Sequence, residues 1–250
     1  MWWLYAWLVW SGFQLLMMLI FPTWIAPLFN KFTPLADEAL KNRIEGLMQR
    51  VGFASKGLFV MDGSKRSAHG NAYFSGFGNN KRIVFFDTLI ERLAPQEVEA
   101  VLAHELGHFK LKHIVKRMVV MFAVSLGFLA LLGFLKSQIW FYTGLGVDPV
   151  MFASSNSAMA LILFMITLPV FTFVLSPLTS ISSRKHEFEA DAFAVKHTNA
   201  NDLVTALVKL YEDNASTLTP DPVHSAFYDS HPPASIRIAH LHQQGQAAAA

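Results

Sequence analysis

The 250-residue sequence predicts a mainly α-helical integral membrane protein with about three transmembrane helices and a polar lobe that carries a metal-binding motif. Hydrophobic residues make up 53% of the chain and charged residues only 15%, whereas an ordinary soluble domain carries about 25% charged residues. The apolar residues gather in long uncharged runs, and about 20 such residues in a helix cross a hydrocarbon core ~30 Å thick. Composition and patterning therefore both indicate a membrane protein.

The first uncharged run covers residues 1–30, because the first charged side chain is Lys31. A secretory signal peptide is the competing interpretation. The run has no basic start and no small-residue cleavage site, however, and Pro22 and Pro27 follow its apolar part. We therefore expect residues 1–30 to form the first transmembrane helix.

Two further runs lie in the second half of the chain. One covers residues 118–135, and the other lies within residues 150–183 and is most apolar from 158 to 178. Each is long enough to span a bilayer as a helix. We expect residues 31–250 to form one domain with transmembrane helices near 118–135 and 158–178 inserted in it.

Basic residues predict the orientation of these helices. The loop of residues 136–157 holds one Lys and one Asp, whereas the segments on the other side of the spans carry Lys31, Lys110, Lys112, Lys116, Arg117, Arg184 and Lys185. Lys and Arg are enriched in cytoplasmic segments, so these segments should face the cytoplasm. We expect a multi-pass protein of the bacterial inner membrane, with the endoplasmic reticulum as the alternative.

The charge pattern also excludes some classes of partner. The net charge is only +2, and the sequence has no dense block of Lys or Arg. Nucleic acid is therefore excluded as a partner. The three apolar runs contain no acidic or basic side chain that would mark an ion pathway, which argues against a transporter. Because the chain has no cysteine, any metal must be bound by nitrogen and oxygen ligands.

The most informative motif is His104-Glu105-Leu106-Gly107-His108. On a helix, an H-E-x-x-H sequence places two imidazoles one turn apart with a carboxylate beside them, which is typical of a zinc site with its own base. Pro95 and the acidic residues after it predict that this helix begins near Ala94. No helix breaker follows before residue 135, so the pattern predicts one continuous helix that enters the membrane.

A third ligand is expected from the helix that leaves the third run. Glu187 follows the end of that run by nine residues, and His108 precedes the second run by ten, so the two should lie at the same depth. His104, His108 and Glu187 would then bind one Zn²⁺ per chain and leave a fourth position for water. Asp191, one turn after Glu187, could orient a ligand imidazole. A solvated acidic helix face is the alternative for both carboxylates.

The chemistry expected of such a site is amide hydrolysis. Zinc polarises the scissile carbonyl and lowers the pKa of its water, and Glu105 would take the proton from that water and pass it to the leaving amine. Glu105 projects about 100° round the helix from His104, which suits a base better than a ligand.

A small β-structure is predicted upstream of the motif. Residues 72–74 and the β-prone stretch 82–86 flank Asn79-Asn80, which together indicate a hairpin. A free edge of this hairpin could bind an extended peptide by strand addition.

With these residues in view, the chain closely resembles the integral-membrane zinc endopeptidases of the CaaX prenyl protease 1 family. His104 to His113 and Glu187 to Asp191 are similar to the two metal-binding elements of that family. The other stretches that carry the resemblance are residues 25–35, 62–77 and 81–89, and Ser230-His231-Pro232-Pro233 with Arg237. The resemblance covers nearly the whole chain.

The resemblance implies a zincin-like metalloprotease lobe with a small β-hairpin or sheet, which would make residues 31–250 a metalloprotease domain. It implies His104, His108 and Glu187 as zinc ligands and Glu105 as the catalytic acid and base. It also implies that three residues hold substrate or stabilise the developing oxyanion: Asn71, His231 and Arg237. From the residues alone, these three would be a turn residue, a loop histidine and a solvated charge.

The expected activity is zinc-dependent endopeptidase cleavage of CaaX-type prenylated or membrane-associated polypeptides, so the expected partners are a peptide substrate and the lipid bilayer. Two alternatives stay open. One is an HtpX-like quality-control protease for membrane proteins, and the other is a non-catalytic fragment that keeps a zinc site. Members of the family usually have further transmembrane helices before the point that corresponds to Met1, so the chain is expected to match their C-terminal part.

Overall fold

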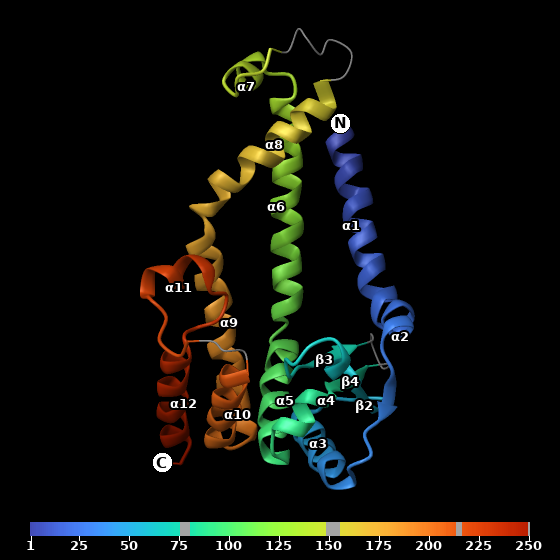
Figure 1. The fold of residues 1–250 in the computed structure, drawn as a ribbon, viewed down its shortest axis with the longest axis vertical. Coiled ribbons are helices and arrows are strands. Elements are labelled where there is room, and N and C mark those ends of the chain that lie inside the picture. The colour runs from blue at the N-terminus through green and yellow to red at the C-terminus, as the bar shows by residue number, and fades with distance from the viewer. Residues whose placement is uncertain (76–80, 149–155, 214–216, 250) are drawn as a thin grey trace. The chain divides into compact units, whose positions relative to one another are not determined.

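The computed structural model describes residues 1–75, 81–148, 156–213 and 217–249. The chain divides into two compact units. We call Met1–Met17 with Ile114–Thr179 the membrane unit, and Met18–His113 with Ser180–Ala250 the site unit. Figure 1 shows the elements of both units in chain order.

The membrane unit is built mainly from the helices α1 (Trp2–Ile20), α6 (His113–Leu135) and α8 (Asn156–Phe173), with the short α7 (Ile139–Thr143). Large apolar side chains point outward from these helices, and Phe171, for example, is 71% exposed. Such a surface is stable when hydrocarbon covers it, and the backbone polar groups are satisfied within the helices. The mainly α-helical integral membrane fold expected from the sequence is confirmed.

Two helical segments, Trp2–Phe29 and His113–Leu135, are long and apolar enough to cross a membrane. The first includes α1, the π-helical turn Phe21–Ile25 and α2 (Ala26–Phe29). A third span is present if Ser157–Phe173 and Ser176–His197 count as one span bent by 62°. The described residues therefore hold two or three candidate spans, depending on how this bent pair is counted.

Close packing joins α1 to α6 inside the membrane unit. Trp7 Nε1 donates hydrogen bonds to the carbonyl oxygen of Phe122 at 3.0 Å and to Ser125 Oγ at 3.2 Å. A methyl group on Gly133 would lie 2.4 Å from Trp3 Cδ1, so only glycine lets the indole approach here. Small residues and side-chain hydrogen bonds of this kind are what hold helices together in lipid, where no hydrophobic force acts between them.

The third run, for which a transmembrane helix near residues 158–178 was expected, is divided between two helices. It breaks after Phe173, and α9 (Ser176–His197) begins in a new direction. Pro177 explains the break, because proline has no N–H to continue the helical hydrogen bonds and its ring excludes the carbonyl of the residue four positions earlier. Proline is well tolerated in the first turn of the helix that follows.

The helix that carries the metal-binding motif is also interrupted, so the prediction of one continuous helix was wrong. It begins at Pro95 as expected, where Glu97 accepts a hydrogen bond from the Ala94 backbone N–H at 2.7 Å. This helix, α5 (Pro95–Lys110), ends before α6 begins at His113. Lys112 between them has a φ of 58°, in the left-handed region that non-glycine residues rarely adopt.

A four-stranded sheet forms one side of the site unit, in the order β1 (Phe32–Pro34), β2 (Leu58–Met61), β4 (Arg82–Phe86) and β3 (Ala72–Ser75). β3 and β4 pair antiparallel as predicted, with Ala72 opposite Phe85, and the expected turn at Asn79-Asn80 lies outside the described residues. β2 pairs parallel to β4. β3 is therefore an outer strand of the sheet, with one edge unpaired among the described strands.

Helices cover this sheet and complete the site unit. α3 (Glu38–Val51) and the short α4 (Asp87–Arg92) contact α5, which in turn contacts α10 (Ala200–Asp213). α10 packs against α12 (Ala234–Ala249), and Figure 1 shows α5, α10 and α12 alongside one another. The remaining pieces are a 3₁₀ turn, Gly63–Lys65, and α11 (Pro222–Tyr228).

The core of the site unit lies between these helices and the sheet. Its fully buried side chains come from α3, β4, α4, α5, α10 and α12, and the largest are Leu40, Ile44, Leu47, Ile83, Phe85, Leu89, Leu102, Leu106, Leu203 and Leu241. Leu102 and Leu106 are therefore buried on α5 next to the motif histidines. Burial of each such side chain contributes about 1.5–3 kcal/mol, so the helix that carries the motif is firmly held.

Candidate metal centre

The motif on α5 places its two imidazoles on one side of the helix. His104 is 6% exposed and His108 is half-buried. Their Nε2 atoms lie 3.1 Å apart, because residues four apart on a helix are neighbours on its surface. Two ring nitrogens thus face the same point.

A glycine in the motif lets α9 bring a carboxylate to this point. A methyl group on Gly107 would lie 3.0 Å from Ala190 Cα and 3.1 Å from its carbonyl oxygen, so α5 and α9 touch through their backbones here. Glu187, one turn before Ala190, is 3% exposed. Its Oε1 lies 3.3 Å from His108 Nε2, and its Oε2 lies 3.6 Å from His104 Nε2.

These three donors have the spacing that one metal ion requires. Ligands about 2.0–2.1 Å from a tetrahedral ion are separated from one another by roughly 3.3–3.4 Å, and the observed separations are 3.1, 3.3 and 3.6 Å. Glu187 Oε2 is buried and accepts no hydrogen bond of good geometry from the described residues. His231 and Arg237 form ion pairs with this oxygen but no well-aligned hydrogen bond. Two imidazoles and one carboxylate at this spacing are the donors that zinc takes, so the donor set fits a bound metal.

The electrostatics of the site keep Glu187 ionised, as a ligand must be. Glu187 lies on the part of α9 that belongs to the site unit, outside the membrane unit. Burial alone would raise the pKa of its carboxyl group, but the close imidazoles outweigh burial and hold the pKa far below its ordinary value. The imidazoles come from His104, His108 and His231.

Asp191 and Arg237 form a buried ion pair behind His104. Asp191 Oδ1 lies 2.9 Å from His104 Nδ1. Arg237 donates to both carboxylate oxygens of Asp191, from Nε at 2.6 Å and from Nη2 at 2.7 Å. A carboxylate on Nδ1 favours a proton there and a lone pair on Nε2, the atom that would face a metal. Arg237 Nη2 also lies 3.2 Å from this Nε2. The pair therefore sets both the tautomer and the orientation of His104.

Glu105 and His231 are the side chains that remain available to a substrate. Glu105 is half-buried, and no described side chain forms a hydrogen bond or ion pair with its carboxylate. The His231 side chain is 61% exposed, with Nδ1 3.1 Å from Glu187 Oε2. Arg237 also approaches that oxygen, at 3.4 Å from Nη1, but it is only 5% exposed.

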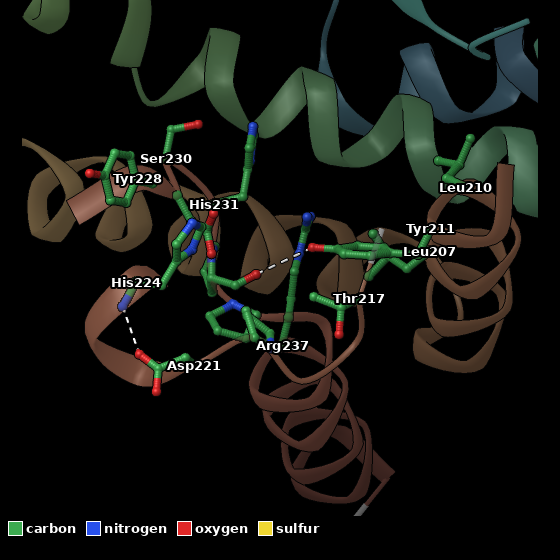
Figure 2. A pocket seen from close by; sticks show the side chains of 14 residues that line it. Leu207, Leu210, Tyr211, Thr217, Asp221, His224, Tyr228, Ser230, His231 and Arg237 are labelled. Carbon is green, nitrogen blue, oxygen red and sulfur yellow. Dashed lines mark hydrogen bonds between the residues drawn. The ribbon is translucent and has the colours of Figure 1, made fainter. Parts of the chain in front are cut away.

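A pocket of about 650 Å³ opens beside His231 and Arg237. Figure 2 shows both side chains on its wall, with Tyr211 from α10 and Tyr228 from α11 also lining it. The Tyr211 hydroxyl donates to the carbonyl oxygen of Pro232 at 3.4 Å, which ties α10 to the loop that carries His231. Because two lining residues also approach Glu187, the pocket adjoins the metal-binding group.

Asn71 is the predicted site residue that the structure does not bring into this group. It is exposed, its Oδ1 accepts a hydrogen bond from the Ala72 N–H at 2.8 Å, and its carbonyl accepts from Phe86 N. No described hydrogen bond or ion pair links it to the three donors. These contacts are those of a residue that begins β3.

Sequence reasoning assigned no role to His113 and Glu189, yet His113 contacts His108, and Glu189 contacts His113. His113 Nδ1 is 3.0 Å from His108 Nδ1, and His113 Nε2 is 2.9 Å from Glu189 Oε2. The spacing gave no signal, because residues five apart in a continuous helix point about 140° away from each other.

Comparison with known proteins agrees with this geometry. The model of peptidase family M48 matches residues 34–244. A second family model, described as the N-terminal part of CAAX prenyl proteases with five membrane helices, matches residues 1–31.

Several characterised proteins are similar to the chain over most of its length. The CAAX prenyl protease 1 homolog of Arabidopsis thaliana is 43% identical over 240 residues, which are 94% of this chain and 54% of that protein. CAAX prenyl protease 1 of Saccharomyces cerevisiae is 40% identical, over 91% of this chain and 53% of that protein. The Homo sapiens homolog is 36% identical, over 94% and 57% respectively.

A solved structure has the same fold. The crystal structure of S. mikatae Ste24p superposes with a TM-score of 0.85 at 36% sequence identity, and the match covers 96% of this chain and 58% of that one. The chain thus spans about half the length of the relatives it matches. Because the family model covers most of the chain and includes every metal-binding residue described above, the chain belongs to peptidase family M48.

Proposed function

We propose that this chain forms the catalytic part of a membrane-embedded zinc endopeptidase that cleaves CaaX-type prenylated or membrane-associated polypeptides. The observation that carries the proposal is the convergence of His104, His108 and Glu187 within 4.8 Å of one another, next to the uncommitted carboxylate of Glu105. Membership of peptidase family M48 and the likeness to CAAX prenyl proteases support the reaction and the substrate class.

His104, His108 and Glu187 would hold the metal, and zinc is the metal that two imidazoles, one carboxylate and an open position suit best. When bound, zinc would supply Lewis acidity, which polarises the scissile carbonyl and makes water acidic at neutral pH. Glu105 would take a proton from the attacking water and deliver it to the leaving amine. The carboxylate is free to do so because no described residue engages it.

The residues around the ligands would divide the remaining tasks. His231 is exposed beside Glu187 and lines the pocket, so it can donate a hydrogen bond to the substrate carbonyl as negative charge develops there. Arg237 is buried, and Asp191 already engages two of its donors. Its main task would therefore be to hold Asp191 against His104. Asn71 would bind peptide near the outer strand β3.

The proposed setting is a bilayer, with the site on its cytoplasmic side. Basic residues flank the spans on the side that carries the metal-binding motif, which is the pattern of cytoplasmic segments. A bacterial inner membrane is the proposed location, with the endoplasmic reticulum as the alternative. A prenylated peptide anchored in the same bilayer would meet the site from the membrane surface.

The test is to purify the chain in detergent and to measure zinc content and cleavage of a farnesylated CaaX peptide, with Glu105→Gln as the matched control. We expect about one zinc per chain in both proteins. Cleavage should fall by roughly 10²–10⁴-fold in the variant, which is the usual contribution of a positioned general base. Zinc without any cleavage of prenylated or unprenylated peptide would leave the metal centre standing and contradict the endopeptidase function. Equal cleavage of the prenylated and the unprenylated peptide by the unaltered chain would favour the quality-control alternative.

A further inference from the structure

A third histidine, His113, lies next to the metal-binding group, on the opposite side of the His108 ring from Glu187. The Nε2 atom of His108 faces His104 and Glu187, at 3.1 and 3.3 Å. Its other ring nitrogen, Nδ1, lies 3.0 Å from His113 Nδ1. His113 is 1% exposed, and its Nε2 lies 2.9 Å from Glu189 Oε2. Three side chains therefore form one line, from Glu189 through His113 to His108.

When His108 binds a metal, the hydrogen bonds along this line can be donated in only one direction, from His108 to His113 and from His113 to Glu189. A metal on Nε2 requires a lone pair there, so the proton of the neutral ring must be on Nδ1. His108 Nδ1–H then donates to His113, whose Nδ1 must accept and whose proton must be on Nε2. His113 Nε2–H can donate to Glu189, which accepts only. Every donor has an acceptor, and both imidazoles stay neutral.

The backbone between α5 and α6 makes this contact possible. In a continuous helix the side chains of residues 108 and 113 would point about 140° apart, so their rings could not meet. Lys112, at φ 58°, interrupts the helical backbone just before His113. A left-handed conformation in a residue other than glycine costs roughly 1–2 kcal/mol, and such strain persists only where surrounding contacts compensate for it. The buried contacts of His113 are the compensation available here.

We propose that His113 and Glu189 are positioning residues that fix the tautomer and the orientation of His108 for the metal. The inference rests on the proposed metal centre but not on its proteolytic activity. His104 is held in the same manner by Asp191 and Arg237. Each ligand histidine then has its own buried partner, which is the arrangement by which proteins raise metal affinity.

The same residues do not favour a second metal site, although His113, His186 and Glu189 lie close together. The rings of His113 and His186 are stacked, with centroids 4.2 Å apart and planes within 15° of parallel. A metal lies near the plane of each imidazole that binds it, because the nitrogen lone pair lies in that plane. Stacked rings point their lone pairs along parallel directions, so they do not converge on one ion.

The experiment measures metal affinity in the 250-residue chain in detergent, without reference to cleavage. Zinc dissociation constants are obtained by competition with a chelator, and Co²⁺ spectra report the geometry of the ligands. His113→Phe fills the same space but removes both nitrogens. His113→Gln is the matched variant, because its amide oxygen can accept from His108 and its amide nitrogen can donate to Glu189.

We expect His113→Phe to raise the zinc dissociation constant about 10–100-fold, the usual cost of losing a partner that orients a ligand, and to shift the Co²⁺ bands. His113→Gln should stay within about threefold of the unaltered chain and keep its spectrum. Glu189→Leu, at a half-exposed position, should weaken binding in the same direction as His113→Phe. The Glu189→Leu variant therefore tests the inference even if His113→Phe does not fold.

Two results would overturn the inference. The first is a dissociation constant for both His113→Phe and Glu189→Leu within threefold of the unaltered value, with unchanged Co²⁺ spectra. The second is two zinc ions per chain, reduced to one by His186→Phe, which keeps the stacking but removes the nitrogens. If the unaltered chain binds one zinc as expected and cleaves no peptide, the endopeptidase proposal fails while this inference stands.

Discussion

The carboxylate of Asp191 is fully buried, so its stability depends on the partners that surround it. Arg237 donates two hydrogen bonds to it, and His104 lies 2.9 Å away. Burial alone would raise the pKa of Asp191, but hydrogen bonds from His104 and Arg237 lower that pKa below its ordinary value. The same charge pair thus both contacts His104 and contributes to the fold of the site unit.

Removing the arginine should be costly for this reason. We predict that Arg237→Met lowers the free energy of unfolding of the metal-free protein by about 3–5 kcal/mol, because it leaves a buried charge without its partner. Chemical denaturation in detergent, followed by circular dichroism, measures the change. Lys41→Met is the control, since the pair of Lys41 with Glu38 is exposed and should contribute at most about 1 kcal/mol. An equal decrease in the free energy of unfolding of both variants would show that the buried pair contributes no more than the exposed one.

At the scale of elements, the approach of α5 to α9 depends on Gly107. Its missing side chain lets the two backbones touch at Ala190. This contact brings Glu187 level with the two histidines, although the residues stand far apart in the sequence. The glycine inside the motif is therefore part of the geometry of the site.

We predict that Gly107→Val lowers the free energy of unfolding by about 1–3 kcal/mol, the usual cost of overpacking a tight contact, and weakens zinc binding because it separates α5 from α9. Thermal unfolding and zinc titration measure the two effects. Gly127→Ala in α6 is the matched control, because no atom lies within 4 Å of the added methyl group. The prediction fails if Gly107→Val binds zinc as tightly as the unaltered chain.

The break between α5 and α6 gives a second prediction at this scale. We predict that Lys112→Gly has a free energy of unfolding about 1–2 kcal/mol higher than that of Lys112→Ile, because φ is positive at this position. At Lys116, within α6, the order should reverse, because glycine is a poor helix former. Unfolding free energies of the four variants give the comparison, and the same order at both positions would contradict the left-handed conformation of Lys112.

The sequence predicted those elements whose signals are local. Pro95 and Glu97 predicted the start of α5, and the β-prone residues 82–86 predicted the strand that pairs antiparallel with β3. The break at Lys112 was missed because Leu111 and Lys112 are good helix formers, whereas the contacts that His113 makes after the break include a residue of a different helix. The parallel pairing of β2 with β4 was likewise not expected, since it joins strands that are distant in the chain.

The candidate site shows the same division. His104, His108 and Glu187 could be grouped from motif spacing and matched distances to the apolar runs. The contacts between His113 and Glu189 could not be predicted, because helix periodicity placed His113 on a different face from His108. Arg237 was expected from family resemblance to touch substrate, whereas its burial beside Asp191 favours a role in holding the ligand.

At the scale of the whole molecule, the apolar surface of the membrane unit decides where the protein can exist. Val124 lies in the middle of α6 and is 48% exposed, in a segment without charged residues from Met118 to Leu135. We predict that Val124→Arg reduces membrane integration, because an arginine at the centre of a span costs about 2.5–3.5 kcal/mol on insertion scales. Alkaline extraction of membranes measures integration, with Val124→Leu as the control. Unchanged integration of the arginine variant would argue against α6 as a span.

The membrane unit interrupts the site unit in the sequence, and this order has a consequence for how the site appears during synthesis. His104 precedes Asp191 by 87 residues and Arg237 by 133. At about 5–20 residues per second, a ribosome that has just made the motif needs roughly 7–27 s to reach Arg237. During that interval the helices of residues 114–179 are made while the ligand set is still incomplete. A nascent chain of this kind would lack the complete group of metal-binding side chains, so the order of residues along the chain delays assembly of the candidate site until the spans have been synthesised.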